Sequence, residues 1–168
     1  MNEDAYAEWL VKRKDPPYAL PAKVGITVLL VVALLAAFVS LLGLVLLVAA
    51  GVAAYFVYTS FSVEYEYLFV EGDLSIDRIL AKSRRKKVLE CKKDEIQIVA
   101  PSDSYMLKDY EKSGMKVKDC SSGTGAKTYS LIYQQGADCV KVIFEPNDRL
   151  LRSMRNYIPR KVVRGEAG

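Results

Sequence analysis

The hydrophobic pattern of the chain is dominated by one uncharged stretch. The residues from 24 to 63 carry no formally charged side chain, and Lys23 and Glu64 bound them. A continuous helix of that length would extend about 60 Å, whereas a bilayer core is about 30 Å thick. Two spans of about 17 residues each would use the whole stretch. The pattern therefore predicts a transmembrane helical hairpin at residues 24–60, with spans at 24–40 and 44–60.

The turn of this hairpin is expected near Ser40–Gly43, where a hydroxyl and a glycine interrupt the apolar run. Each span is at the short limit for a bilayer, so a re-entrant hairpin or a locally thinned membrane remains open. One long tilted helix that extends beyond the membrane is the other alternative. A single span would separate the two ends of the chain across the membrane, whereas a hairpin would not.

Residues 1–23 form the segment before the hairpin. Tyr6, Trp9, Leu10 and Arg13 follow a three-four spacing, which predicts a short helix at about 3–14 lying on the membrane surface and ended by Pro16. A frayed polar tail is the alternative. Aromatic residues at both ends of the hairpin are typical of a membrane interface. The predicted interface residues are Trp9, Tyr18, Tyr55, Phe56, Tyr58 and Phe61.

From residue 61 to residue 168 the pattern changes to that of a soluble domain. Val63, Tyr65, Tyr67 and Phe69 alternate with more polar residues, which predicts a strand with one apolar face. Glu71–Asp73 then turns the chain. A short helix is expected at about 105–111. Further strands are predicted at 74–81, 87–91, 95–99, 117–120, 128–134 and 139–145.

The clearest helix of this domain follows Pro146 and Asn147, which suit a helix entry and cap, and Pro159 ends it. Leu150, Leu151, Met154, Tyr157 and Ile158 form its apolar stripe, and Arg149, Arg152 and Arg155 lie on the opposite face. The prediction is an α+β domain: an antiparallel sheet or barrel of about six or seven strands with a C-terminal amphipathic helix. This layout is similar to that of pleckstrin-homology-like (PH-like) domains.

The chain also resembles a family of uncharacterised bacterial two-helix membrane proteins. The resemblance lies in the hairpin, the segment 62–68 with its turn at Gly72, Asp77–Ile79, the basic run 82–87 and the closing segment 159–162. It covers nearly all of the chain from the hairpin onward. It implies a location in the bacterial inner membrane and a domain of unknown function, and supplies no activity.

The formal net charge of +4 belongs to the part after the hairpin, because residues 1–23 carry four basic and four acidic groups. Each basic side chain near an anionic leaflet contributes about 1 kcal/mol to the attraction to the membrane. The run 82–87 therefore predicts contact with membrane lipid or an acidic protein partner, and a signal for membrane topology is the alternative. Nucleic acid is disfavoured because no aromatic residues are interleaved with the charges. The candidate binding residues are Lys82, Arg84, Arg85, Lys86, Lys87, Arg149, Arg152 and Arg155.

The orientation follows from basic residues before the hairpin, since positive charge favours the cytoplasmic side. Lys12, Arg13, Lys14 and Lys23 lie there, and the predicted turn has none. We therefore expect a multi-pass protein with both termini in the cytoplasm. Three widely spaced cysteines fit a reducing compartment and apolar positions in or near a core, although one extracytoplasmic disulfide remains open. They are Cys91, Cys120 and Cys139.

Catalytic chemistry is disfavoured because the chain has no histidine, the commonest general base. The cysteines also lack the spacing of a zinc site, so no catalytic residue, metal or cofactor is predicted. The sequence favours a non-enzymatic, membrane-anchored binding or scaffold module that contacts anionic lipid headgroups or a protein partner at the cytoplasmic face. The alternatives are a homo-oligomer and an accessory subunit of a larger transport or secretion complex, because Gly25, Gly43 and Gly51 permit close helix contacts.

Overall fold

The structure is a computed structural model that describes residues 6–163, and it divides into two compact units. The hairpin unit consists of residues 15–63 and 80–84. The sheet unit consists of the remaining described residues, 6–14, 64–79 and 85–163. The segment before the membrane helices thus belongs to the same unit as the strands after them.

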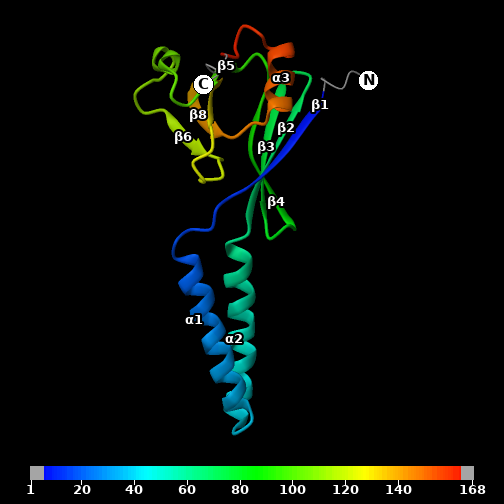
Figure 1. The fold of residues 1–168 in the computed structure, drawn as a ribbon, viewed down its shortest axis with the longest axis vertical. Helices are drawn as coiled ribbons and strands as arrows, with labels where there is room; N and C mark the ends of the chain where they lie inside the picture. Colours follow the sequence, from blue (N-terminus) through cyan, green and yellow to red (C-terminus); the bar gives the residue numbers. More distant parts are fainter. Residues whose placement is uncertain (1–5, 164–168) are drawn as a thin grey trace. The chain divides into compact units, whose positions relative to one another are not determined.

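The hairpin unit contains two long apolar helices, α1 (Ala19–Ala37) and α2 (Leu41–Ser60) (Figure 1). Their mean hydropathies are 2.3 and 2.4, and both are long enough to cross a membrane. At 1.5 Å per residue they extend about 28 and 30 Å, which matches a bilayer core. The alternative of one continuous helix is therefore wrong. Because α1 begins at Ala19 rather than at residue 24, neither helix is at the short limit expected from the sequence.

Small residues bring the two helices together. Ala33, Gly43 and Ala50 are buried between them, and a Cβ atom added to Gly43 would overlap the backbone of Ala36. The turn, residues 38–40, begins two residues before the predicted Ser40–Gly43, and the Ser40 hydroxyl caps α2 by accepting a hydrogen bond of 3.1 Å from the Gly43 amide. Close backbone packing thus holds the closed end of the hairpin.

The first sheet of the sheet unit has the order β1-β2-β3-β4 (Figure 1). These strands are β1 (Tyr6–Lys12), β2 (Val63–Val70), β3 (Asp73–Leu80) and β4 (Arg84–Cys91). The predicted surface helix at 3–14 is wrong, because residues 6–12 form β1; residues 3–5 lie outside the described part. β1 pairs antiparallel with β2, so its buried positions are Ala7 and Val11, which alternate with exposed Tyr6 and Leu10.

The second sheet has the order β5-β7-β8-β6. Its strands are β5 (Ile96–Pro101), β6 (Lys116–Asp119), β7 (Tyr129–Gln135) and β8 (Asp138–Phe144), and a short 3-10 helix, η2, covers Tyr105–Asp109. The seven predicted strands are confirmed with small shifts in their bounds, and β1 is the eighth. The expectation of a purely antiparallel sheet is wrong, because β6 pairs parallel with β8.

The helix α3 (Asp148–Tyr157) confirms the predicted C-terminal amphipathic helix. The Asn147 side chain caps it by accepting a hydrogen bond of 2.8 Å from the Leu150 amide. Its buried residues include Leu150 and Met154, and Tyr157 packs edge-on against Phe69 of β2 at 6.2 Å. The two sheets and α3 therefore share one core in the sheet unit.

The centre of this core is Tyr67 of β2. Its ring is fully buried and meets Phe144 of β8 edge-on at 5.7 Å. Its hydroxyl donates to the Cys120 carbonyl oxygen at 2.7 Å and accepts from the Glu145 amide at 3.3 Å. Because these partners belong to the second sheet or directly adjoin it, Tyr67 joins the two sheets by both packing and hydrogen bonding.

Candidate membrane-facing basic site

The basic run 82–87 lies mostly in a strand, because the strand predicted at 87–91 begins three residues earlier than the sequence indicated. β4 begins at Arg84, and the tip between β3 and β4 is formed by Ala81 and Lys82. Their φ values are 51° and 57°, which are those of a type I′ hairpin turn. The Ser83 amide closes this turn by donating to the Leu80 carbonyl oxygen at 3.1 Å. Lys82 thus stands at the tip of a tight hairpin.

This tip is tied to the end of α2. The Ala81 amide donates to the carbonyl oxygen of Ser62 at 2.8 Å, and Ser62 lies two residues beyond Ser60, where α2 ends. Two extended residues span at most about 7 Å, and the headgroup layer of one leaflet is about 5 to 7 Å thick. Ser62, to which the tip is bonded, therefore lies within one headgroup thickness of the end of a helix that matches the bilayer core.

The cations of the run differ in their pairing. Arg85 makes two hydrogen bonds to the Glu66 carboxylate, at 2.7 and 3.2 Å, and the Lys87 ammonium lies 2.6 Å from Glu90. Burial raises the pKa of Glu66, and the Arg85 charge offsets part of that rise. No ion pair involves the remaining basic residues of the run within the described part of the chain. These residues are Lys82, Arg84 and Lys86, and all three are exposed.

The open end of the hairpin unit gathers aromatic and charged groups. Tyr18 meets Phe61 edge-on at 5.9 Å, and the Lys23 ammonium lies 5.6 Å from the centre of the Phe61 ring. Lys23 also forms an ion pair of 2.6 Å with Asp15. One turn further along the helices, Thr27 and Tyr58 share a hydrogen bond of 2.9 Å. The structure thus brings together three of the predicted interface residues and adds Asp15 and Thr27, which the sequence did not indicate.

The other predicted interface residues lie elsewhere. Tyr55 and Phe56 are on the exposed surface of α2. Trp9 lies on β1 opposite Tyr67, and 41% of its surface is exposed. Because β1 belongs to the sheet unit, Trp9 does not lie on the surface helix from which its role was predicted.

The arginines of α3 do not join the run 82–87. Arg149 and Arg152 are exposed and Arg155 is half-buried. α3 packs on Phe69 near the end of β2, and the chain beyond it is fixed where the Lys161 ammonium donates to the Lys93 carbonyl oxygen at 2.7 Å. Lys93 follows the end of β4, whereas the basic run lies at its start. Within the sheet unit, Arg85, Lys86 and Lys87 therefore form a group separate from the arginines of α3.

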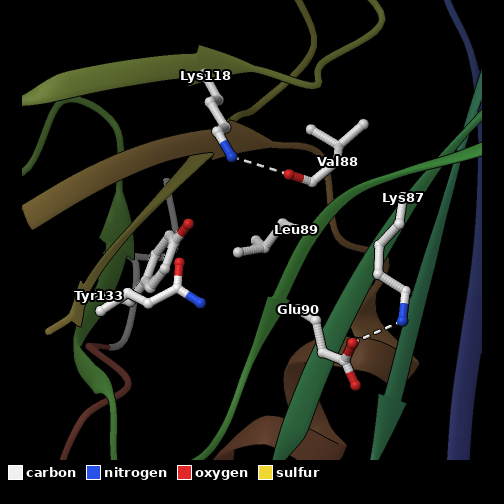
Figure 2. Close-up of a pocket in the computed structure, with 7 residues that line it drawn as sticks. Lys87, Val88, Leu89, Glu90, Lys118 and Tyr133 are labelled. Carbon is white, nitrogen blue, oxygen red and sulfur yellow. Dashed lines mark hydrogen bonds and ion pairs between the residues drawn. The ribbon is translucent and has the colours of Figure 1, made fainter. Parts of the chain in front are cut away.

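A shallow cleft of about 340 Å³ opens between β4 and the second sheet (Figure 2). Lys87 and Glu90 pair with each other at its rim, and the Lys118 ammonium donates to the Val88 carbonyl oxygen at 2.8 Å. Tyr133 and Leu89 supply much of the remaining wall. The charged groups drawn in this cleft thus have partners within the protein: Lys87 and Glu90 pair along β4, and the Lys118 bond joins β4 to β6 of the second sheet.

The three cysteines are free thiols. Cys91 and Cys120 are buried, which confirms the expected core positions, and Cys139 is partly buried against Met115. Burial raises the pKa of Cys91 to about 12 and that of Cys120 to about 11. A thiolate is the reactive form, so neither of these thiols is set up as a nucleophile.

The sequence missed the groups that organise this site because their signals are not local. Ser62 acts through its backbone carbonyl oxygen, which no residue type reveals. Glu66 occupies one of the alternating polar positions of β2, and its partner Arg85 lies on a strand that is not its neighbour in the sheet. The basic run was predicted from the sequence alone, and its role in binding stays a prediction.

Comparison with known proteins gives one match. No curated protein and no solved structure is similar enough to match the chain. A family model described as "Bacterial PH-like domain (DUF6106)" matches residues 3–164. This range includes β1, the membrane hairpin and all eight strands. It confirms the resemblance to bacterial two-helix membrane proteins with a PH-like domain. The chain belongs to the family of bacterial PH-like domains of unknown function, DUF6106.

Proposed function

We propose that this protein is a non-enzymatic, membrane-anchored module whose basic β3–β4 tip contacts anionic lipid headgroups at the cytoplasmic face of the bacterial inner membrane. The observation that carries the proposal is the hydrogen bond between Ala81 and Ser62. It keeps Lys82 and Arg84 beside the end of α2, where headgroups are found. Each such cation contributes about 1 kcal/mol near an anionic leaflet before screening.

The pairing of β1 with β2 supports the side of the membrane on which this contact occurs. β1 precedes the hairpin and β2 follows it, yet the two strands pair from Tyr6–Val70 to Lys12–Glu64. Strands can pair in this way only when both lie on the same side of the membrane, which requires an even number of crossings. The basic residues from Lys12 to Lys14 favour the cytoplasmic side.

Four features support a binding role rather than catalysis. PH-like domains are typically non-catalytic, the sequence has no histidine, and burial keeps the Cys91 and Cys120 thiols protonated. The charged side chains of the cleft beside β4 are paired within the protein. These groups are therefore better suited to holding the fold than to acting on a substrate.

Hydrogen exchange of the full chain in lipid nanodiscs tests this proposal. We expect slower amide exchange in residues 80–87 when the nanodiscs contain phosphatidylglycerol than when they contain phosphatidylcholine alone. The effect should weaken as salt is added, because screening reduces contacts between exposed charges. Equal exchange in the two lipids at low salt would contradict lipid contact.

A second candidate function, as an accessory subunit of a larger membrane complex, is favoured by the outer surface of the hairpin. A Cβ atom added at Gly25 or Gly51 would meet nothing within 4 Å, whereas Gly43 is packed against Ala36. The first two glycines therefore take no part in the hairpin's own packing and leave room for another helix. Purification in mild detergent tests this alternative: recovery of the protein alone, in a single stoichiometry, would count against it.

A further inference from the structure

We propose that Lys82 and Arg84 form a discrete contact site for the phosphate of an anionic phospholipid, and that the contact does not arise from the net charge of the run 82–87. This inference rests on the proposed function, because it names the residues that carry out lipid contact. Both side chains belong to the hairpin unit, together with the end of α2.

The tip has an uncommon backbone conformation. Type I′ turns favour Asn and Gly at their two central positions because both have positive φ. Here those positions hold Ala81 and Lys82, and a side chain is disfavoured in that region of backbone space. The protein thus keeps a lysine where glycine would fit the turn better. Strain of this kind persists at functional sites, where the side chain has a use beyond folding.

The basic residues of the run differ in whether they are already paired. Arg85 and Lys87 already have carboxylate partners, Glu66 and Glu90. A contact with an anion would have to compete with these ion pairs. Lys82, Arg84 and Lys86 have no ion pair within the described residues and are exposed, and of these Lys82 and Arg84 belong to the same unit as the end of α2. Their charges are therefore available to a ligand.

The position of the tip selects a lipid phosphate over a phosphate ion in solution. The Ala81–Ser62 hydrogen bond ties the tip to a residue that lies within about 7 Å of the end of α2, which is about the depth of the headgroup layer. Lysine offers three donors and arginine a planar fork of donors, and both suit phosphate oxygens. A lipid phosphate is concentrated in that layer, whereas a dissolved phosphate is not.

Thermal unfolding of the full chain in phosphatidylcholine micelles, with and without added phosphatidylglycerol, tests the proposal. A ligand that binds the folded state raises the unfolding temperature. Ala81→Gly and Lys82→Gly each relieve one positive φ, but the second also removes a charge. In neutral micelles we expect both variants to unfold at or above the temperature of the wild type. With phosphatidylglycerol, Ala81→Gly should keep the full rise in unfolding temperature. Lys82→Gly should bind phosphatidylglycerol about fivefold more weakly and show a smaller rise.

A charge-matched pair, Lys82→Gln and Lys87→Gln, separates a discrete site from net charge. The site predicts about fivefold weaker binding of phosphatidylglycerol for Lys82→Gln, the same for Arg84→Gln, and an almost unchanged response for Lys87→Gln. Equal losses in Lys82→Gln and Lys87→Gln would overturn the site but leave the proposed function standing. A wild-type protein that does not respond to phosphatidylglycerol would instead refute the proposed function.

Two further results would overturn the site. One is that Lys82→Gly unfolds below the wild type in neutral micelles, which would mean that the lysine fits its turn without strain. The other is that inorganic phosphate added to phosphatidylcholine micelles reproduces the whole rise in unfolding temperature, which would mean that the ligand need not be a lipid. We expect neither, and we expect phosphate to leave the unfolding temperature unchanged.

Discussion

Ala7 lies directly opposite Phe69 in the first sheet, although the whole membrane hairpin separates them in the chain. Both residues are buried. The hairpin is therefore an insertion between two neighbouring antiparallel strands of one domain. This relationship makes the N-terminal segment a structural part of the soluble domain and joins the folding of the domain to the topology of the membrane segment.

The first prediction concerns the boundaries of the domain. A fragment that begins at residue 62 lacks β1, so Phe69 and Tyr65 lose their neighbours in the sheet. It also loses the burial of Val11, which alone contributes about 1.5 to 3 kcal/mol to the free energy of unfolding. We expect this fragment to unfold without a cooperative transition in circular dichroism. A chain in which a short Gly/Ser linker replaces residues 15–62 keeps β1 beside β2 and should unfold cooperatively. Equal behaviour of the two chains would show that β1 is dispensable.

The second prediction concerns the packing of the hairpin. Gly43→Ala places a methyl group against the Ala36 backbone, where there is no room, and should destabilise the protein by about 1 to 3 kcal/mol. Gly51→Ala is the matched control, because its added methyl group meets nothing within 4 Å. It should be neutral or slightly stabilising, since alanine favours helix more than glycine does. Unfolding in detergent micelles measures both, and equal losses would argue against the close contact at Gly43.

The third prediction concerns the hydroxyl that joins the two sheets. Tyr67→Phe leaves the Cys120 carbonyl oxygen and the Glu145 amide without the buried partner that they have now. The expected loss is about 1 to 3 kcal/mol in the free energy of unfolding by denaturant. Tyr105→Phe removes a hydroxyl from a side chain that is 72% exposed, so its stability should match the wild type. A Tyr67→Phe protein as stable as this control would contradict the role given to Tyr67.

The fourth prediction concerns thiol reactivity. Burial raises the pKa of Cys91 to about 12 from a usual value of 9.0, so the fraction of thiolate at pH 8 is about a thousandfold lower than for an ordinary cysteine. Cys120, with a pKa of about 11, should also react slowly. Mass spectrometry after brief maleimide treatment should find Cys139 modified first, and all three at similar rates in denaturant. Early modification of Cys91 in the folded protein would contradict its burial.

Much of this fold follows from the sequence, for reasons seen in particular elements. The uncharged residues 24–63 are too many for one span and require a turn, and Ser40 and Gly43 provide it. The alternation from Val63 to Phe69 and the cap at Asn147 predict β2 and α3 because both signals are local. Each depends on side-chain spacing within one element.

The elements that sequence reasoning missed depend on partners far along the chain. β1 was mistaken for a helix because Tyr6, Trp9 and Leu10 have helical spacing, whereas its pairing with β2 selects the alternation of Ala7 and Val11. At the candidate site the residue types indicated the basic run, and its binding role stays a prediction. Tertiary contacts decide which cations of the run are paired and which are available. Tertiary contacts also attach the β3–β4 tip to the end of α2, through a backbone carbonyl oxygen.

The most direct test of the account is cysteine accessibility in intact cells, since the central claim is that the hairpin returns the domain to the cytoplasmic side. Val39→Cys, in the turn of the hairpin and 87% exposed, and Tyr105→Cys, on the domain, provide two reporter sites in a Cys139→Ser background. A membrane-impermeant maleimide should label the Val39→Cys protein in intact cells and the Tyr105→Cys protein only after permeabilisation. Labelling of Tyr105→Cys from outside intact cells would contradict the cytoplasmic location and the lipid contact proposed from it.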